Sequence, residues 1–238
     1  YVAVSRRLAA VANYNGGSMS LFYILDDGSL SGLVHIIKGR TGGPDQSRQF
    51  CPHVHCACFS LDGKYIFASD FSADRILRYP LTGNKNEKAL CSWSVETQGG
   101  YGPRHLVFSP DGRFLYLIGE LSDRVTVFEY TEGNLTKVQS ILADYDRGRG
   151  GADIRISPDG RFLYTSHRLY NDKIVIFSRN PSNGKLDRIG QMTTAEHPRQ
   201  FAITPDGRFF LVACLRANKI QIFGRNVRTG LLHDMHHD

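Results

Sequence analysis

An eight-residue motif with the consensus Ser-Pro-Asp-Gly-Arg-Phe-Leu-Tyr occurs four times in this chain, and its spacing limits the fold more than any other feature. The copies occupy residues 60–67, 109–116, 157–164 and 204–211, so successive Asp-Gly pairs lie 49, 48 and 47 residues apart. Proline fixes φ and glycine tolerates positive φ, so each copy predicts a tight turn between two strands. A period of this length is typical of an architecture built from repeated units.

The copy within residues 102–128 shows how one repeat is built. Three short runs rich in β-branched and aromatic residues, Leu106–Phe108, Phe114–Ile118 and Val125–Phe128, are separated by turn residues. Such runs predict consecutive antiparallel strands. A degenerate fifth repeat, residues 7–22, is expected to open the chain just before its second strand. The third strands are expected to end at Phe22, Tyr79, Phe128, Phe177 and Phe223.

Fourth strands are expected after the glycines at 28, 133, 184 and 230. Four strands in a repeat of about 48 residues, with no helical period, predict an all-β chain folded as a β-propeller of four-stranded antiparallel blades. About five blades are present. We expect residues 1–238 to form a single β-propeller domain that is truncated at both ends.

Blade topology predicts which loops share a face. Because neighbouring strands run in opposite directions, the loop leading into the first strand (the leading loop) lies beside the connection from the second strand to the third. The Asp-Gly turns lie on the opposite face and indicate structure. The leading loops and these connections carry chemically capable side chains, among them histidines, arginines and carboxylates, at residues 12–15, 51–55, 69–70, 102–105, 119–120, 150–153, 166–168 and 197–200. These residues predict a site for a small anionic ligand.

Composition narrows the function classes. The net charge is +6, but the basic residues are scattered rather than gathered in a stripe with aromatics, so we expect no nucleic-acid partner. No apolar run approaches the roughly 20 residues of a membrane span. The five cysteines form no paired framework, which favours a reducing compartment, and we expect a cytoplasmic monomer or weak oligomer without a signal peptide.

The sequence lacks the motifs that several kinds of catalysis require. The sequence has no nucleophilic serine elbow, phosphate-binding loop or dinucleotide fingerprint, so covalent acyl-enzyme chemistry and an organic cofactor are not expected. In an extended segment His53 and His55 point to one side and Cys56 and Cys58 to the other, which argues against a metal site. Cys51 has no recognisable base beside it in the sequence and is expected to be inert.

At the level of whole motifs, the chain resembles the family of seven-bladed β-propeller lactonases. The propeller-type 6-phosphogluconolactonases typify that family, and the carboxymuconate lactonising enzymes are related to it. The resemblance runs through residues 13–22, 52–55, 102–106, 119–121, 152–154 and 198–201 and through the Ser-Pro-Asp-Gly turns. It implies that the five expected blades are part of a seven-bladed propeller.

The resemblance also implies site residues. It places catalytic groups at Glu120, at Arg104 and at His53 or His55, and a further arginine at Arg168 or Arg199. Expected substrate-binding residues are Arg168, Arg199, His105, Asp153 and Asn13. Structural alternatives are a solvated surface position for Glu120, a ring of salt bridges for the arginines, buried structural histidines, and a turn-shaping role for Asn13.

The function implied by the resemblance is a hydrolase that opens a sugar lactone, with 6-phosphogluconolactone in the pentose phosphate pathway as the expected substrate. The arginines would hold the phosphate and the oxyanion, and Glu120 or a histidine would deprotonate the attacking water. No metal or other cofactor is expected. Two alternatives are a lactonising or isomerising enzyme for a muconate-type dianion and a non-catalytic propeller that binds proteins.

Overall fold

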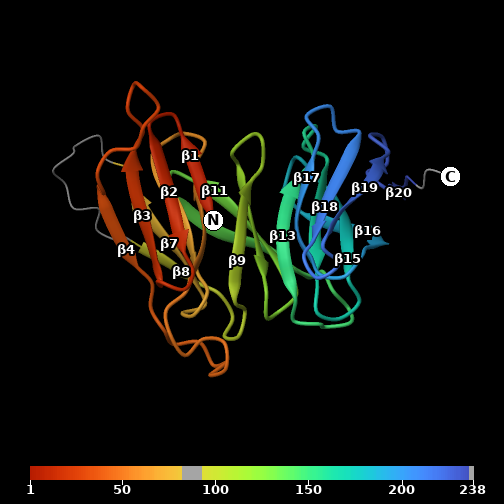
Figure 1. The fold of residues 1–238 in the computed structure, drawn as a ribbon, viewed down its shortest axis with the longest axis horizontal. Helices are drawn as coiled ribbons and strands as arrows, with labels where there is room; N and C mark the ends of the chain where they lie inside the picture. Colours follow the sequence, from red (N-terminus) through yellow and green to blue (C-terminus); the bar gives the residue numbers. More distant parts are fainter. Residues whose placement is uncertain (82–92, 236–238) are drawn as a thin grey trace. The chain divides into compact units, whose positions relative to one another are not determined.

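The computed structural model of the protein describes residues 1–81 and 93–235 (Figure 1). Within these residues the chain forms strands β1 to β20 in five four-stranded sheets, and no helix that could cross a membrane is present. Cys91 and the last residues of the histidine-containing tail, His236 to Asp238, lie outside the described residues.

Strands β1 to β8 form the first two sheets. The first has the order β1-β2-β3-β4 and contains β1 (Val2–Ser5), β2 (Leu8–Asn13), β3 (Ser18–Tyr23) and β4 (His35–Lys38). The second has the order β5-β6-β7-β8 and contains β5 (Val54–Phe59), β6 (Tyr65–Asp70), β7 (Arg75–Pro80) and β8 (Trp93–Glu96).

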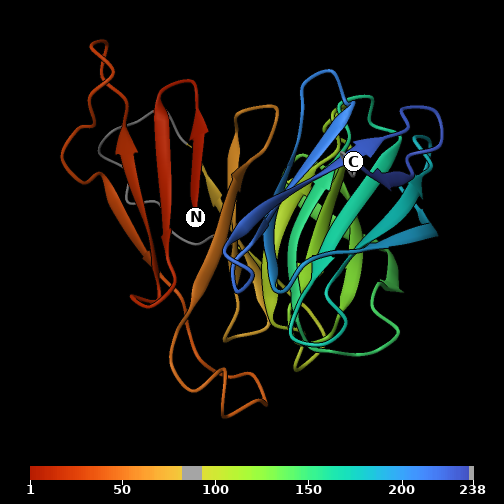
Figure 2. The same ribbon diagram turned by 45° about the vertical axis from the view of Figure 1, so that its right-hand side comes forward.

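The remaining three sheets follow in chain order (Figure 2). The third contains β9 (Pro103–Phe108), β10 (Phe114–Gly119), β11 (Arg124–Thr131) and β12 (Asn134–Leu142). The fourth contains β13 (Gly151–Ile156), β14 (Phe162–His167), β15 (Lys173–Arg179) and β16 (Leu186–Thr193). The fifth contains β17 (Pro198–Ile203), β18 (Phe209–Cys214), β19 (Lys219–Arg225) and β20 (Leu232–Asp234).

The predicted fold class is confirmed. Each sheet is a meander in which consecutive strands are neighbours, which is the construction of a propeller blade. The third strands contain the five aromatic residues at which they were expected to end, but each strand continues beyond its aromatic residue, as β11 does from Phe128 to Thr131. The four Asp-Gly pairs lie in the turns between first and second strands.

The start of the chain differs from its prediction. The chain was expected to begin just before a second strand, but Val2–Ser5 form β1 and pair with β2 in the antiparallel register Val4↔Ala9. The expectation is wrong because β1 is short and the turn after it, Ser5-Arg6-Arg7, has no Asp-Gly pair.

The residues group into two compact units. Unit 1 comprises residues 1–108 and 131–135, and unit 2 comprises residues 109–130 and 136–238. The core of unit 1 includes buried apolar side chains from the first two sheets, among them Met19, Ile66 and Leu77. The core of unit 2 includes a corresponding layer from the fourth and fifth sheets, among them Tyr164, Phe201 and Phe223. Whether residues 1–238 form one truncated domain stays a prediction.

The Asp-Gly turns share one hydrogen-bonding pattern. In the turn after β13, Ser157 Oγ donates to Asp159 Oδ1 at 2.6 Å and accepts from Phe162 N at 3.1 Å. Asp159 Oδ1 also accepts from Arg161 N at 3.0 Å. In the other three turns the hydroxyl of Ser60, Ser109 or Thr204 likewise donates to the aspartate two residues later. The repeated motif is therefore explained by turn structure, as the sequence indicates.

This pattern predicts how acid acts on the fold. Burial alone would raise the pKa of Asp159, but the bonds from Ser157 and Arg161 and the charge of Arg225 outweigh it and lower the pKa. A lowered pKa stabilises the fold above the unfolded value near 3.8, and this stabilisation is lost as pH falls through the folded value.

Asp159→Asn should therefore destabilise the protein at pH 7 by about 1 kcal/mol or less, because the carboxylate is partly screened by water. Urea unfolding at pH 7 and at lower pH values should show the wild-type advantage shrinking below about pH 4. An advantage that grows on acidification would contradict this assignment.

Candidate functional site

In the second, fourth and fifth sheets the leading loop lies beside the connection from the second strand to the third, as predicted. Within the second sheet Phe71 N donates to His53 O at 2.9 Å, within the fourth Arg168 N donates to Gly150 O at 3.1 Å, and within the fifth Leu215 N donates to His197 O at 2.9 Å. The loops that carry the predicted site residues are thus joined in pairs by backbone hydrogen bonds.

Unit 2 contains a buried contact between two predicted site residues. Glu120 follows β10 and Arg168 follows β14, and Arg168 Nη2 donates to Glu120 Oε2 at 2.7 Å. Their side chains are 4% and 6% exposed. The solvated surface position considered for Glu120 is therefore wrong. A buried carboxylate paired with one guanidinium can orient a water molecule or bind a polar ligand.

His197, which precedes β17, extends this contact. Its Nε2 lies 3.4 Å from Arg168 Nη1. Arginine can only donate, so Nε2 is the acceptor and the proton is on Nδ1. Nδ1 is buried and has no hydrogen-bond partner among the described residues. Burial lowers the pKa of His197, and the charges of Arg168, Arg216 and Arg199 lower it further, which favours the neutral imidazole.

His197 lies in a leading loop, residues 197–200, that the sequence predicts to contribute to the site, but no motif indicates its contact with Arg168. Its φ of 65° is unusual for a residue other than glycine. Backbone strain of this kind at a buried polar residue is a feature of functional sites.

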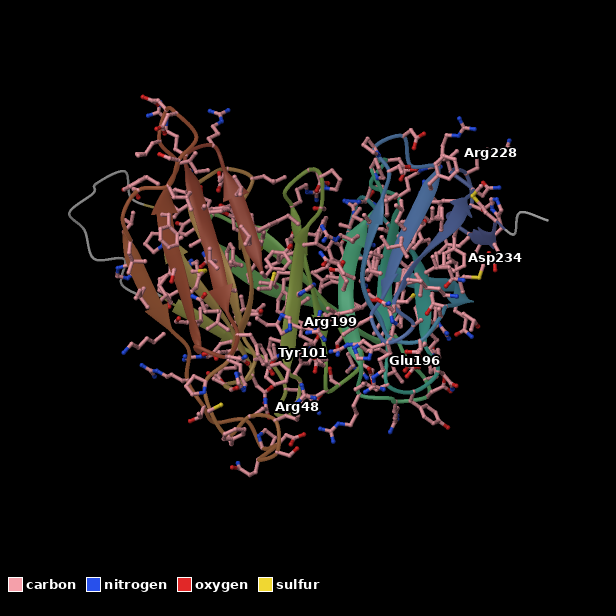
Figure 3. All side chains as sticks on the ribbon, in the orientation of Figure 1. Arg48, Tyr101, Glu196, Arg199, Arg228 and Asp234 are labelled. Atoms are coloured by element: carbon pink, nitrogen blue, oxygen red, sulfur yellow. The ribbon has the colours of Figure 1, made fainter. Side chains whose placement is uncertain are left out.

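Two other predicted residues of unit 2 have different surroundings. The carboxylate of Asp153 accepts from Ile154 N at 3.0 Å, Arg155 Nε at 3.2 Å and Phe201 N at 3.3 Å, so it links β13 to β17. Arg199 on β17 is exposed (Figure 3). Of the two arginines that the sequence left open, Arg168 is the one that contacts Glu120. Substrate binding by Asp153 or Arg199 stays a prediction.

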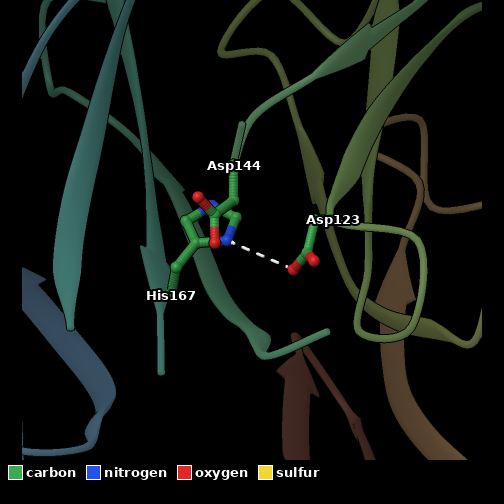
Figure 4. Close-up of side chains that lie close together, drawn as sticks. All are labelled: Asp123, Asp144 and His167. Atoms are coloured by element: carbon green, nitrogen blue, oxygen red, sulfur yellow. Dashed lines mark ion pairs between the residues drawn. The ribbon is translucent and has the colours of Figure 1, made fainter. Parts of the chain in front are cut away.

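A second buried cluster in unit 2 joins Asp123, Asp144 and His167, whose potential ligand atoms lie within 4.8 Å of one another (Figure 4). Asp123 accepts from three backbone amides, those of Arg149 at 2.6 Å and of Gly150 and Gly151 at 3.1 Å.

One carboxylate of this cluster, that of Asp144, already has a cation. Lys173 Nζ lies 2.7 Å from Asp144 Oδ1 and also contacts Asp146. Burial would lower the pKa of Lys173, but hydrogen bonds to both carboxylates raise it. The cluster therefore supports the leading loop of the fourth sheet rather than presenting open ligand positions.

The predicted residues of unit 1 gather around Tyr14. The ring of His53 stacks on that of Tyr14 with 4.1 Å between centroids and an interplanar angle of 1°. The ring of His55 packs edge-on against the ring of Tyr14, with 5.1 Å between centroids. The His55 ring also packs edge-on against the ring of His105, with 5.0 Å between centroids. As expected from their spacing, His53 and His55 share one side of the chain.

Arg104 and Asn13 complete the predicted set. Arg104 is 2% exposed, and its Nη1 donates to His105 Nε2 at 3.2 Å, which places the His105 proton on Nδ1. Its carbonyl accepts from Ser69 Oγ at 2.6 Å. The Asn13 amide donates to Ser20 Oγ at 3.1 Å and, at 3.4 Å, to Ser18 Oγ and Val11 O, which matches the turn-shaping alternative.

Cys51 corrects an expectation. It was expected to lack a base, but its Sγ lies 3.3 Å from His53 Nε2. Cys51 and His53 are two residues apart, a spacing at which side chains share one side of an extended segment, so the contact does not require a distant part of the chain.

Close backbone packing fixes the position of Arg168. A Cβ added at Gly150 would lie 1.6 Å from the carbonyl oxygen of Arg168 and 2.6 Å from its carbonyl carbon. Gly150→Ala should therefore displace Arg168 and destabilise the protein by about 3 kcal/mol or more, because neither backbone can yield cheaply. Urea unfolding measures the effect.

Gly32→Ala is the matched control, since a Cβ there has no atom within 4 Å. It should change the free energy of unfolding by less than about 0.5 kcal/mol. Equal stabilities of the two variants would contradict the close packing of Gly150 against Arg168.

Comparisons with known proteins agree with this architecture. The family model described as lactonase, 7-bladed beta-propeller, matches residues 1–238. A 6-phosphogluconolactonase of Formosa agariphila is 39% identical, with 97% of this chain and 67% of the relative covered. A 6-phosphogluconolactonase of Bacillus subtilis is 32% identical, with 93% of this chain and 64% of the relative covered.

Solved structures give the same picture. A Bacteroides uniformis protein superimposes with a TM-score of 0.95 at 50% identity, covering 99% of this chain and 69% of its own. The periplasmic gluconolactonase of Pseudomonas aeruginosa superimposes with a TM-score of 0.90 at 34% identity, and the match covers 98% of this chain and 68% of the gluconolactonase. The fold and its loops thus define a propeller-type lactonase, and the chain belongs to the family of lactonases with a seven-bladed β-propeller.

Proposed function

We propose that this protein hydrolyses a sugar lactone, with 6-phosphogluconolactone as substrate and 6-phosphogluconate as product. The observation that carries the proposal is the buried contact of Arg168 with both Glu120 and His197 in a chain of the lactonase family. Lactone opening requires a base for water and positive charge for the oxyanion, and this contact contains a carboxylate and a guanidinium.

In the proposed reaction Glu120 accepts a proton from the attacking water. As the carbonyl carbon becomes tetrahedral, its oxygen gains negative charge, which a neighbouring guanidinium stabilises. Arg168 also holds the Glu120 carboxylate in one orientation through its 2.7 Å bond. The proton then passes to the ring oxygen, which leaves as a hydroxyl, and no covalent intermediate with the protein is required.

His197 gives the proposed site a neutral donor. Its Nδ1–H is buried without an acceptor among the described residues, and its pKa is lowered, so it can donate to a ligand oxygen near pH 7 without adding charge. An unpaired buried donor is costly unless a ligand satisfies it. This residue therefore belongs with the substrate contacts that we propose.

The residues of unit 1 are proposed to act in the same reaction. Groups that act in one chemical step lose activity non-additively, so kcat of Glu120→Gln, Arg104→Ala and the double variant tests this proposal. A double variant about as slow as the slower single variant supports it. Fully multiplicative losses would oppose it.

We also propose a cytoplasmic location and a role in the pentose phosphate pathway. The described cysteines, Cys51, Cys56, Cys58 and Cys214, are all free, as is usual in a reducing compartment. Subcellular fractionation of the source cells tests the location, and recovery of the protein outside the cytoplasm would overturn it.

The substrate proposal is tested by comparing freshly made 6-phosphogluconolactone with the unphosphorylated gluconolactone, subtracting spontaneous opening in each case. If the arginines bind the phosphate, kcat/KM should be higher for the phosphorylated lactone by about tenfold or more. Equal values would leave a lactonase without phosphate recognition. Selective action on a muconate-type lactone would favour the lactonising alternative.

A further inference from the structure

The contact between Cys51 and His53 in unit 1 has the geometry of an activated thiol. Cys51 Sγ lies 3.3 Å from His53 Nε2, and His53 Nδ1 lies 2.9 Å from the carbonyl oxygen of Tyr14. A carbonyl only accepts, so Nδ1 carries the proton and donates it. Nε2 therefore has its lone pair available for the thiol proton. Cys51 is thus placed as a nucleophile, His53 as its base and the Tyr14 carbonyl as the group that orients the base, which is the arrangement of an activated nucleophile.

The protein holds this pair in place from both sides. The Tyr14 ring stacks on the ring of His53, which is 8% exposed. Gly17, with a φ of 58°, packs against Pro52, the residue between the pair, so closely that an added Cβ would lie 2.6 Å from the Pro52 carbonyl oxygen. Gln49 anchors the segment by donating to Phe71 O and Asp74 Oδ1, each at 2.9 Å.

Cys51 has a histidine nitrogen 3.3 Å from its Sγ. Cys56 and Cys214 are buried at 0% and 2% exposure. Cys58 is partly accessible, but burial, with a smaller contribution from Cys56, raises the pKa of its thiol well above the ordinary value. Cys51 combines partial exposure with a positioned base.

We propose that Cys51 is a site of reversible modification by small disulfides, activated by His53. The Cys51 thiol transfers its proton to His53 Nε2, and the thiolate attacks one sulfur of the disulfide. A new sulfur–sulfur bond forms to Cys51, the original one breaks, and the departing thiolate takes the proton from His53. The products are a mixed disulfide on Cys51 and one free small thiol.

Modification would also act on His53. The mixed disulfide removes the thiol that donates to Nε2 and places a bulky group beside a predicted site residue. If the proposed function holds, lactone hydrolysis should fall on modification and recover on reduction. The modification itself does not depend on the proposed function, so its test uses mass rather than activity.

The test exposes the full chain carrying Cys91→Ser, which removes the cysteine outside the described residues, to glutathione disulfide. Peptide mass spectrometry follows each cysteine with time. We expect Cys51 to be modified about tenfold faster than Cys58 or more, with full reversal by dithiothreitol. Equal rates at Cys51 and Cys58 would overturn the proposal, and this comparison requires no change near the site.

His53→Gln should slow modification of Cys51 by about tenfold or more, because the thiol loses its base. His35→Gln is the matched control: His35 lies on β4 in the same unit, and its replacement should leave the rate within about twofold. Circular dichroism checks that both variants fold. A Cys51 rate unaffected by His53→Gln in a folded chain would contradict activation by His53.

Discussion

Replacing Glu120 by glutamine should lower kcat for lactone hydrolysis by about 10²- to 10⁴-fold, the usual contribution of a positioned general base. Glutamine is nearly the same shape, and its carbonyl oxygen can still accept the 2.7 Å bond from Arg168, so the fold should persist. The amide is not basic, however, so it cannot take the proton of the attacking water. Steady-state kinetics on freshly made lactone measure the effect.

Glu196→Gln is the matched control for this variant. Glu196 lies in unit 2 as well, but its side chain is 58% exposed and its contact with Arg216 spans 3.6 Å. Its replacement should leave kcat within about twofold, since exposed ion pairs contribute little. If Glu120→Gln retains the wild-type kcat while folded, Glu120 is not the base.

Replacing Arg168 by methionine should have the largest effect on stability. The side chains of Arg168 and Glu120 are nearly fully buried, so removing the guanidinium breaks a 2.7 Å ion pair to a buried carboxylate. Loss of one partner of a buried ion pair costs about 3–5 kcal/mol. Urea unfolding should show a decrease of this size in the free energy of unfolding.

Two comparisons make this prediction specific. Arg199→Met changes an exposed arginine of the same unit and should alter the free energy of unfolding by less than about 0.5 kcal/mol. In a Glu120→Gln background, Arg168→Met should cost less than in the wild type, because the ion pair between these two side chains is already absent. Similar costs for Arg168→Met and Arg199→Met would refute the buried pair.

The strands could largely be predicted from sequence because the residues that form each strand and its turn are close together in the chain. Each Asp-Gly turn joins strands only a few residues apart, and Ser157 and Asp159 bond within the same motif. β1 escaped prediction because the turn that follows it lacks this motif.

The site was harder to predict because its contacts are distant in sequence. Arg168 is 48 residues from Glu120 and 29 from His197. The resemblance to family motifs indicated Glu120 and Arg168 as site residues but not that they contact each other. It also did not decide whether Arg168 or Arg199 is the further arginine of the site. Burial separates those two arginines, and burial depends on the packing of whole sheets. His197 and the Cys51–His53 contact depend on loop conformation, for which the sequence carries no pattern.

The most direct test of the proposed function is the initial rate of 6-phosphogluconate formation from freshly prepared 6-phosphogluconolactone, followed by a coupled dehydrogenase with spontaneous opening subtracted. The proposed function predicts a rate that is proportional to protein concentration and is lost in the folded Glu120→Gln variant. A folded wild-type chain that adds nothing to spontaneous opening would contradict it.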